Sequence, residues 1–255
     1  MPTLRSRDGT TIGFERIGSG PSLVLVHGGA TDRTRFAPVL PAFEAVRTVL
    51  NVDRRGRGLS GDSDAYALER EVDDLAAVCA AAEPPVDVFA HSFGAIVALE
   101  AARRGGIRRL VLYEPPIGLP AGPPGTLARL RALLDAGDRD GVVALSFAAV
   151  IGLPDAAVTR LREQPTWAGR IAAAHTLVRE FEAAEAYRPD PALDSLSTPV
   201  LFLVGETSPP ALRAATEKIA RLVPSARLEV LAGQGHLGID AAPAAVARAV
   251  LGFVA

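Results

Sequence analysis

The stretch Val86-Asp87-Val88-Phe89-Ala90-His91-Ser92-Phe93-Gly94 decides the fold of this chain. An apolar run leads into a serine flanked by small residues, and a helical pattern follows over residues 95–100. A sharp strand-to-helix turn of this kind holds its serine in a strained backbone conformation and excludes bulky residues two positions to either side. Ala90 and Gly94 occupy those positions, so the pattern predicts that Ser92 is exposed as a nucleophile.

Composition indicates a globular protein with a sizeable core, since 49% of the 255 residues are hydrophobic and 22% are charged. A net charge of −2 gives no electrostatic basis for binding nucleic acid or a membrane surface, so we expect neither partner. Residues 1–8 show no secretory pattern, and no apolar run reaches the length of a membrane span. Cys79 is alone, which excludes a disulfide framework and a cysteine-based metal site. We expect a cytoplasmic monomer or homodimer that acts on a small molecule without metal or cofactor.

Apolar strands alternate with helical stretches along most of the chain, which is typical of an α/β fold with a mostly parallel sheet flanked by helices. The expected strands cover residues 11–17, 22–26, 46–50, 86–89, 110–113, 200–204 and 227–231. The expected helices between them cover roughly residues 33–43, 69–82, 95–104, 210–222 and 242–253.

One segment interrupts this alternation, because no strand is evident between Tyr113 and Pro199. A Pro/Gly-rich linker opens it, and helical patterns follow near residues 126–135, 141–151, 154–164 and 168–187. The sequence therefore predicts a core of residues 1–114 and 195–255, with residues 115–194 inserted as a helical lid over an active site. The alternative is additional helical packing without a role in access.

Three further motifs follow expected strands. His27-Gly28-Gly29-Ala30 forms a glycine-rich turn whose unpaired backbone amides can point at a developing oxyanion. Asp53-Arg54-Arg55-Gly56-Arg57-Gly58 forms a charged turn, and Gly233-Gln234-Gly235-His236 places a histidine after the last expected strand. The carboxyl ends of parallel strands meet at one edge of a sheet, so these motifs are expected to lie together.

In order and spacing these motifs resemble those of the α/β-hydrolase superfamily over essentially the whole chain. The resemblance implies that Ser92 is the nucleophile and that His236 is the general base and then the acid. It also implies that the amides of Gly29 and Phe93 form the oxyanion hole. The chemistry agrees, because a serine hydroxyl is a poor nucleophile until a neighbouring imidazole takes its proton.

The triad acid departs from the family pattern. Similar hydrolases place an aspartate in a G-x-x-D pattern after the strand expected at 200–204, whereas this chain has Gly205-Glu206-Thr207-Ser208. Glu114 follows the strand at 110–113 and resembles the acid position of some haloalkane dehalogenases. Glu206 is an alternative acid. The third possibility is a Ser92–His236 dyad without an acid, in which Ser208 or a water orients His236. If Glu114 has no catalytic role, we expect it to be a carboxylate of the linker that faces solvent.

The remaining histidines have simpler interpretations. His27 is expected to hydrogen-bond within its own turn, and His91 to point away from Ser92 because successive strand residues face opposite sides. His175 is either an ordinary helix residue or part of the substrate pocket. Trp167 is a bulky anchor of the predicted lid, and together with His175 it is our candidate for substrate binding.

The function expected first is a serine hydrolase that cleaves a small carboxylic ester, lactone or thioester through an acyl-enzyme. The alternative on the same fold is a cofactor-free cyclase, lyase or C–C hydrolase of secondary metabolism, in which the Ser/His pair moves protons only. A third hypothesis is a non-catalytic binding protein on a hydrolase scaffold, since fold alone does not fix function.

Overall fold

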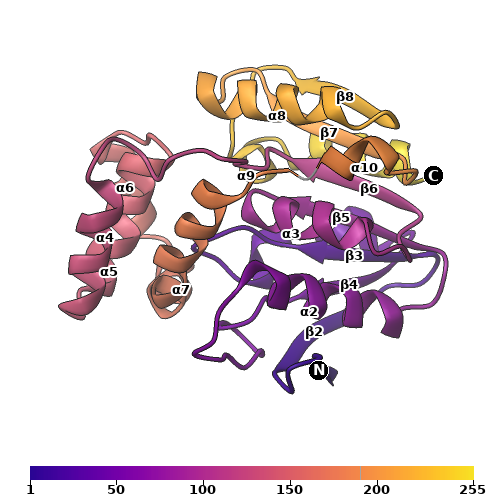
Figure 1. The fold of residues 1–255 in the computed structure, drawn as a ribbon, viewed down its shortest axis with the longest axis horizontal. Helices are drawn as coiled ribbons and strands as arrows, with labels where there is room; N and C mark the ends of the chain where they lie inside the picture. The colour runs from indigo at the N-terminus through magenta and orange to yellow at the C-terminus, as the bar shows by residue number, and fades with distance from the viewer. Residues whose placement is uncertain (190) are drawn as a thin grey trace.

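A computed structural model describes residues 1–189 and 191–255, and it contains an eight-stranded sheet in the order β1-β2-β4-β3-β5-β6-β7-β8 (Figure 1). The strands β3 to β8 run parallel, while β1 and β2 are antiparallel to their neighbours. The expected α/β fold with a mostly parallel sheet is therefore confirmed. The strands are β1 (Thr3–Arg5), β2 (Thr11–Ile17), β3 (Ser22–Val26), β4 (Thr48–Val52), β5 (Val86–His91), β6 (Arg109–Tyr113), β7 (Val200–Gly205) and β8 (Ala226–Leu231).

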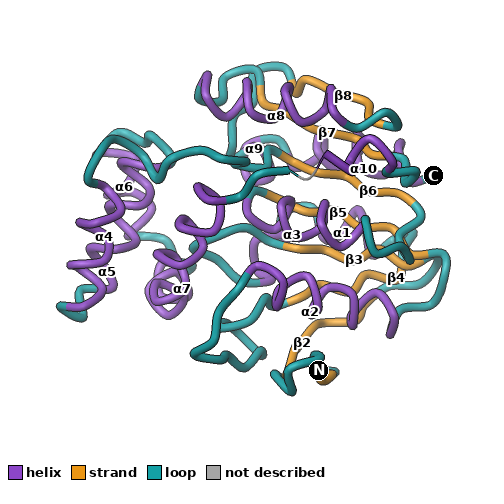
Figure 2. The backbone as a smooth tube through the Cα atoms, viewed as in Figure 1, coloured by secondary structure: helices purple, strands orange, loops and turns teal. Residues whose placement is uncertain are grey.

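Helices cover both faces of the sheet, because alternate side chains of each buried strand point to opposite sides. In β3, Val24 and Val26 join one apolar core, and Leu23 and Leu25 join the other. The helices α2 (Leu68–Ala81), α3 (Phe93–Ala102) and α8 (Pro210–Leu222) supply the first core. The second core is supplied by α1 (Leu40–Glu44) and α10 (Pro243–Val254), which lie behind the sheet in Figure 2.

Between β6 and β7 the described residues form helices and no strand. These are α4 (Thr126–Asp135), α5 (Arg139–Leu145), α6 (Asp155–Arg162) and α7 (Trp167–Ala186), with a π turn at Ser146–Val150 and a 3₁₀ turn at Pro191–Ser195. The helices α4 to α7 stand beside the sheet at the left of Figure 1, and with the π turn they form an apolar core of their own. Residue 190 of the expected 115–194 insertion lies outside the described residues. The role of this segment as a lid stays a prediction.

Local structure differs from the expectation at two places near the N-terminus. The short edge strand β1 was not expected, because three residues, of which two are exposed and one is half-buried, carry no recognisable pattern. The helix expected at 33–43 is divided into a 3₁₀ turn, η1 (Arg33–Phe36), and the helix α1. Pro38 lies between them, and a proline interrupts a helix because it has no amide hydrogen to donate.

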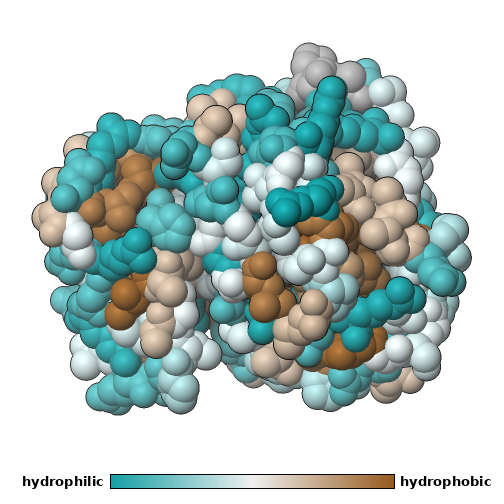
Figure 3. Space-filling model, turned by 90° about the horizontal axis from the view of Figure 1, so that it is seen from below, coloured by the Kyte–Doolittle hydropathy of each residue, from teal (hydrophilic) through white to brown (hydrophobic). Residues whose placement is uncertain are grey.

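The surface is mixed in polarity. On the face shown in Figure 3, hydrophilic residues surround separate apolar patches. No helix in the described part of the chain has the length and apolar character that a bilayer span requires.

The turn from β5 into α3 is sharp and closely packed. Ser92 has φ 56° and ψ −126°, a backbone conformation that residues with a side chain seldom adopt. A Cβ on Gly94 would lie 2.4 Å from the carbonyl oxygen of His27 and 2.6 Å from that of Val26. The end of β3 therefore packs directly against α3, and only glycine fits at position 94.

We expect Gly94→Ala to lower the free energy of unfolding by about 1–3 kcal/mol, because the added methyl group forces backbone atoms apart. Gly252→Ala is the matched control, since an added Cβ there meets nothing within 4 Å in helix α10. That variant should gain about 0.5–1 kcal/mol through the reduced entropy of its unfolded chain. Urea denaturation measures both changes, and equal effects at the two positions would contradict the close approach at Gly94.

Candidate active site

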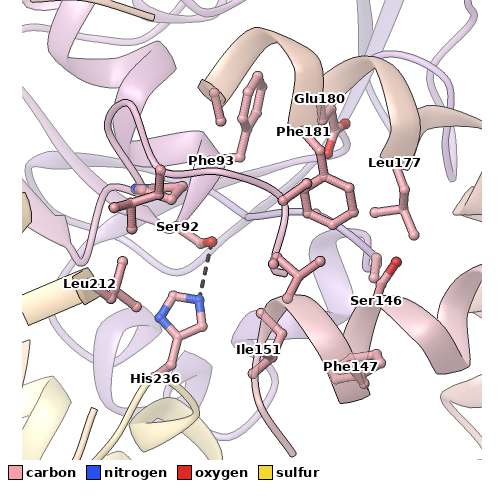
Figure 4. A pocket seen from close by; sticks show the side chains of 18 of the residues that line it. Ser92, Phe93, Ser146, Phe147, Ile151, Leu177, Glu180, Phe181, Leu212 and His236 are labelled. Carbon is pink, nitrogen blue, oxygen red and sulfur yellow. Dashed lines mark hydrogen bonds between the residues drawn. The ribbon is translucent and has the colours of Figure 1, made fainter. Parts of the chain in front are cut away.

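Ser92, Glu114 and His236 follow three different strands and form one hydrogen-bonded chain. The hydroxyl of Ser92 lies 3.1 Å from Nε2 of His236 (Figure 4), and Nδ1 of His236 lies 2.7 Å from Oε2 of Glu114. A carboxylate only accepts, so Nδ1 carries the proton and Nε2 is left to accept one from the serine. This arrangement can activate a hydroxyl as a nucleophile.

Glu114 is held rigidly in this position. Its side chain is fully buried, its φ is 49°, and its second oxygen, Oε1, accepts the amide hydrogen of Gly205 at 2.7 Å. Its own amide donates to the carbonyl of Leu203 at 3.1 Å. The solvent-facing interpretation of Glu114 is therefore wrong, because the strained turn after β6 directs the carboxylate inward.

The other two candidates for orienting the imidazole lie differently. Glu206 is exposed, and its Oε2 accepts the amide hydrogen of Gly233 at 2.7 Å. Ser208 is buried, and its hydroxyl has no hydrogen-bond partner among the described residues. Of the three, Glu114 is the one that the described structure joins to His236 by a hydrogen bond.

Two backbone amides lie beside Ser92, as the sequence predicts for an oxyanion site. Gly29 and Phe93 both line the cavity next to the hydroxyl, and neither amide donates a hydrogen bond to another described residue. Gly28 lets the loop after β3 approach, since a Cβ there would lie 2.8 Å from Cβ of Ser92. Free amides in this place can stabilise negative charge on a carbonyl oxygen.

Ser92 and His236 open into a cavity of about 330 Å³. In Figure 4 the apolar side chains of Ile151, Leu177 and Phe181 stand across the cavity from them. The helical segment between β6 and β7 supplies this far wall, while the strand ends supply the reactive groups. The volume is at the lower end of the range for ligand sites, which favours a small substrate.

The two residues predicted to bind substrate, Trp167 and His175, do not line this cavity. Trp167 packs against Phe147 in the helical core, and its indole N–H donates to Asp140 at 2.7 Å. His175 lies near the surface with Nε2 3.4 Å from the carboxylate of Asp62. This corrects the prediction for both residues.

The helical phase of α7 explains the error for His175. The residues of α7 that line the cavity follow the spacing of one helix face: Arg170, Leu177, Glu180, Phe181 and Ala184. His175 lies two positions from Leu177, which turns it by about 200° away from that face. Sequence reasoning also missed Arg35, Arg170 and Glu180 in the cavity wall, because charged residues in amphipathic segments usually face solvent.

A buried ion cluster lies behind the loop of residues 27–30, which is the predicted oxyanion loop. Arg54 donates to Glu71 at 2.6 Å, to Glu180 at 3.0 Å and to the carbonyl of Gly28 at 3.1 Å. Its guanidinium also lies 4.7 Å from the ring centre of Phe93. Burial lowers the pKa of Arg54, but the carboxylates of Glu180 and Glu71 outweigh it and raise the pKa overall. One permanently charged residue thus contacts both segments that carry the free amides.

Two further histidines are buried at the site. His27 donates from Nδ1 to the carbonyl of Gly28 at 2.8 Å, which confirms its role within the turn. His91 lines the cavity and donates from Nε2 to the carbonyl of His236 at 3.0 Å. The pKa of each lies well below 6.5, for His27 through burial and the charge of Arg57, and for His91 chiefly through burial. Both rings are therefore neutral, and each holds a backbone carbonyl of the site by a hydrogen bond.

Several known proteins with similar sequences and structures are hydrolases. The model of the alpha/beta hydrolase family matches residues 23–249. The 2-(acetamidomethylene)succinate hydrolase of Mesorhizobium japonicum is 27% identical over 96% of this chain and 91% of its own length. An alpha/beta hydrolase from Sphaerobacter thermophilus has a TM-score of 0.89 and 38% identity over 100% of both chains. A hydrolase from Pseudomonas aeruginosa has a TM-score of 0.79 and 25% identity over 99% of this chain and 97% of its own.

The depressed pKa values of His27 and His91 predict a stability that falls in mild acid. Below pH 6.5 the unfolded histidines take up protons while the buried ones stay neutral, so the unfolded state binds more protons. Each such histidine contributes about 1.4 kcal/mol per pH unit to the slope. His91→Gln keeps a hydrogen-bond donor and should flatten the slope by up to about that amount, as urea denaturation at several pH values will measure. An unchanged slope would contradict a neutral buried His91.

Proposed function

The chain belongs to the α/β hydrolase family, and from that premise we propose that it hydrolyses a small carboxylic ester, lactone or thioester through an acyl-enzyme. The observation that carries the proposal is the buried chain from Glu114 through His236 to Ser92, which ends beside two free amides at a cavity. The matching relatives are hydrolases, which supports the cleavage of a bond by water.

The proposed reaction begins with attack by Oγ of Ser92 on the carbonyl carbon. The serine proton passes to Nε2 of His236, and the carboxylate of Glu114 stabilises the imidazolium. The carbonyl oxygen becomes an oxyanion that accepts hydrogen bonds from the amides of Gly29 and Phe93. When the tetrahedral intermediate collapses, His236 returns the proton to the departing alcohol or thiol.

Water then completes the cycle. His236 takes a proton from the water as it attacks the acyl carbon, and the same two amides stabilise the second oxyanion. Collapse of this intermediate releases the carboxylic acid and returns the proton to Ser92. Every proton and acyl transfer in these steps is balanced by Ser92, His236 and water, so the proposed reaction needs no cofactor.

We assign the helical segment over residues 115–194 a lid function within this proposal. Its helix α7 and the π turn face Ser92 across the cavity with apolar side chains, including Phe147 and Phe181. Excluding water from such a site strengthens the hydrogen bonds made to the oxyanion. The same wall favours a substrate whose acyl or alcohol part is moderately apolar.

An altered acid position would favour the alternative of a cyclase, lyase or C–C hydrolase, in which the Ser/His pair moves protons only. Glu114 lies 2.7 Å from His236, which supplies the acceptor that an acyl-enzyme mechanism requires. The geometry therefore supports the hydrolase over this alternative.

A fluorophosphonate should modify Ser92 stoichiometrically, because the reagent traps an activated serine. Ser92→Ala should lose the labelling and at least about 10³-fold in the turnover of p-nitrophenyl esters, thioesters or lactones. Ser146→Ala is the control for labelling, since Ser146 also lines the cavity while its hydroxyl donates to the carbonyl of Val142. Mass spectrometry identifies the labelled residue. Product formation by Ser92→Ala at the wild-type rate would exclude the acyl-enzyme.

Glu114→Gln should reduce kcat by roughly 10²–10⁴-fold, because the amide cannot stabilise an imidazolium by charge. Glu206→Gln should keep nearly wild-type turnover, since its exposed side chain contacts Gly233 rather than the imidazole. Steady-state kinetics on one ester compares the pair. The reverse ranking of the two variants would assign the acid to Glu206.

A further inference from the structure

Two arginines stand in the wall of the active-site cavity without a catalytic role in the proposed reaction. Arg35 belongs to η1 and is 6% exposed, and Arg170 belongs to the first turns of α7. Both also line a second, smaller cavity of about 70 Å³ next to the first. Because both side chains line the same two cavities, they lie close to each other. Burial and then the charge of Arg35 lower the pKa of Arg170.

Their hydrogen bonds are incomplete. Arg35 donates from Nη1 to Asp240, while its Nε and Nη2 are buried and have no partner among the described residues. Arg170 donates from Nη1 to the carbonyl of Ala30 at 3.1 Å, and its Nε is likewise buried and unpartnered. A guanidinium offers five N–H donors, and buried donors of native proteins are nearly always paired. The unpaired donors of Arg35 and Arg170 therefore predict that a hydrogen-bond acceptor binds between or beside these two side chains.

The nearby carboxylates do not satisfy that need. Asp240 is half exposed beside Arg35, and Asp32 accepts the amide and the hydroxyl of Thr34 at the start of η1. Glu180 is the single carboxylate among the described residues that line the larger cavity. Its Oε1 pairs with Arg54 and Arg57, while its Oε2 is buried and has no partner among the described residues. Toward the substrate, Arg35 and Arg170 thus present positive charge in a wall that is otherwise mainly apolar.

We propose that Arg35 and Arg170 form a carboxylate-binding subsite, and that the substrate carries a carboxylate in addition to the bond that Ser92 attacks. The planar fork of a guanidinium matches a carboxylate with two parallel hydrogen bonds, which a neutral ester group cannot reproduce. A substrate of this class places its anion on the arginines and its scissile carbonyl at Ser92. This inference rests on the proposed hydrolase function and specifies its substrate.

Matched pairs of substrates test the proposal. One series consists of p-nitrophenyl monoesters of dicarboxylic acids from glutarate to suberate, each compared with its methyl-capped neutral counterpart. A second series places the carboxylate on the leaving group, as carboxymethyl esters compared with their methyl-capped forms. We expect kcat/KM to favour the anionic member by roughly 10- to 100-fold in at least one series, as for a hydrogen-bonded charge pair. Preference for the neutral member in both series would overturn the subsite.

Variants then assign the preference to the two arginines. Arg35→Gln and Arg170→Gln should each reduce the ratio of anionic to neutral kcat/KM by roughly 10-fold or more. The ratio cancels any general effect on the oxyanion loop, which matters because Arg170 also bonds to Ala30. Arg160→Gln is the matched control on the exposed face of α6 and should keep the wild-type ratio. A ratio unchanged in both cavity variants would contradict the assignment.

The two proposals fail in distinguishable ways. Ser92-dependent hydrolysis of neutral esters without any anionic preference would leave the hydrolase intact and reject the subsite. If neither series is hydrolysed, the proposed function fails, and binding of glutarate to the folded protein still tests the arginines by calorimetry. Binding that is lost in Arg170→Gln and kept in Arg160→Gln supports the subsite, and absence of binding rejects it.

Discussion

The hydrogen bond between Glu114 and His236 connects the elements on which the site depends. It runs from the end of β6 to the loop after β8 and passes over β7, whose Gly205 amide holds the other carboxylate oxygen. A Cβ on Gly205 would lie 2.6 Å from the carbonyl of Gln234, so the histidine loop packs directly on the end of β7. Three parallel strands ending at one edge make this contact possible, and glycine at the middle strand permits it.

In the proposed triad, the acid is selected by geometry and not by its position in the sequence. An imidazole needs one acceptor fixed near Nδ1, and any strand end at the same edge can provide it. Ser208 occupies the place where the family pattern has aspartate, and its buried hydroxyl has no partner among the described residues. Glu114 reaches the imidazole from the neighbouring strand with a side chain one methylene longer than aspartate. The accompanying strain, φ 49°, is typical of functional turns.

The parts of the structure that local sequence specifies were predicted well. Apolar strands, the small residues around Ser92 and the glycine turn at Gly28 each have a signature within a few residues. Chain order could suggest Glu114, Glu206 or a dyad with Ser208 or a water, whereas it is the turn geometry after β6 that favours Glu114. Trp167 and His175 were misassigned because composition does not reveal which face of α7 meets the cavity. Arg35 was missed for a similar reason, since nothing in a short 3₁₀ turn marks a buried side chain.

The buried arginines of this site differ in how their donors are used. Arg54 is paired with two carboxylates and a carbonyl, so it has a structural function behind the oxyanion loop. Arg35 and Arg170 keep donors unpaired, and Arg170 also holds the carbonyl of Ala30, next to Gly29. In the proposed complex, a substrate anion on Arg170 would therefore stabilise the same loop that supplies an oxyanion amide. Binding energy from the remote carboxylate would then help to position the amide that stabilises the oxyanion. Binding energy used in this way lowers the activation barrier and raises kcat.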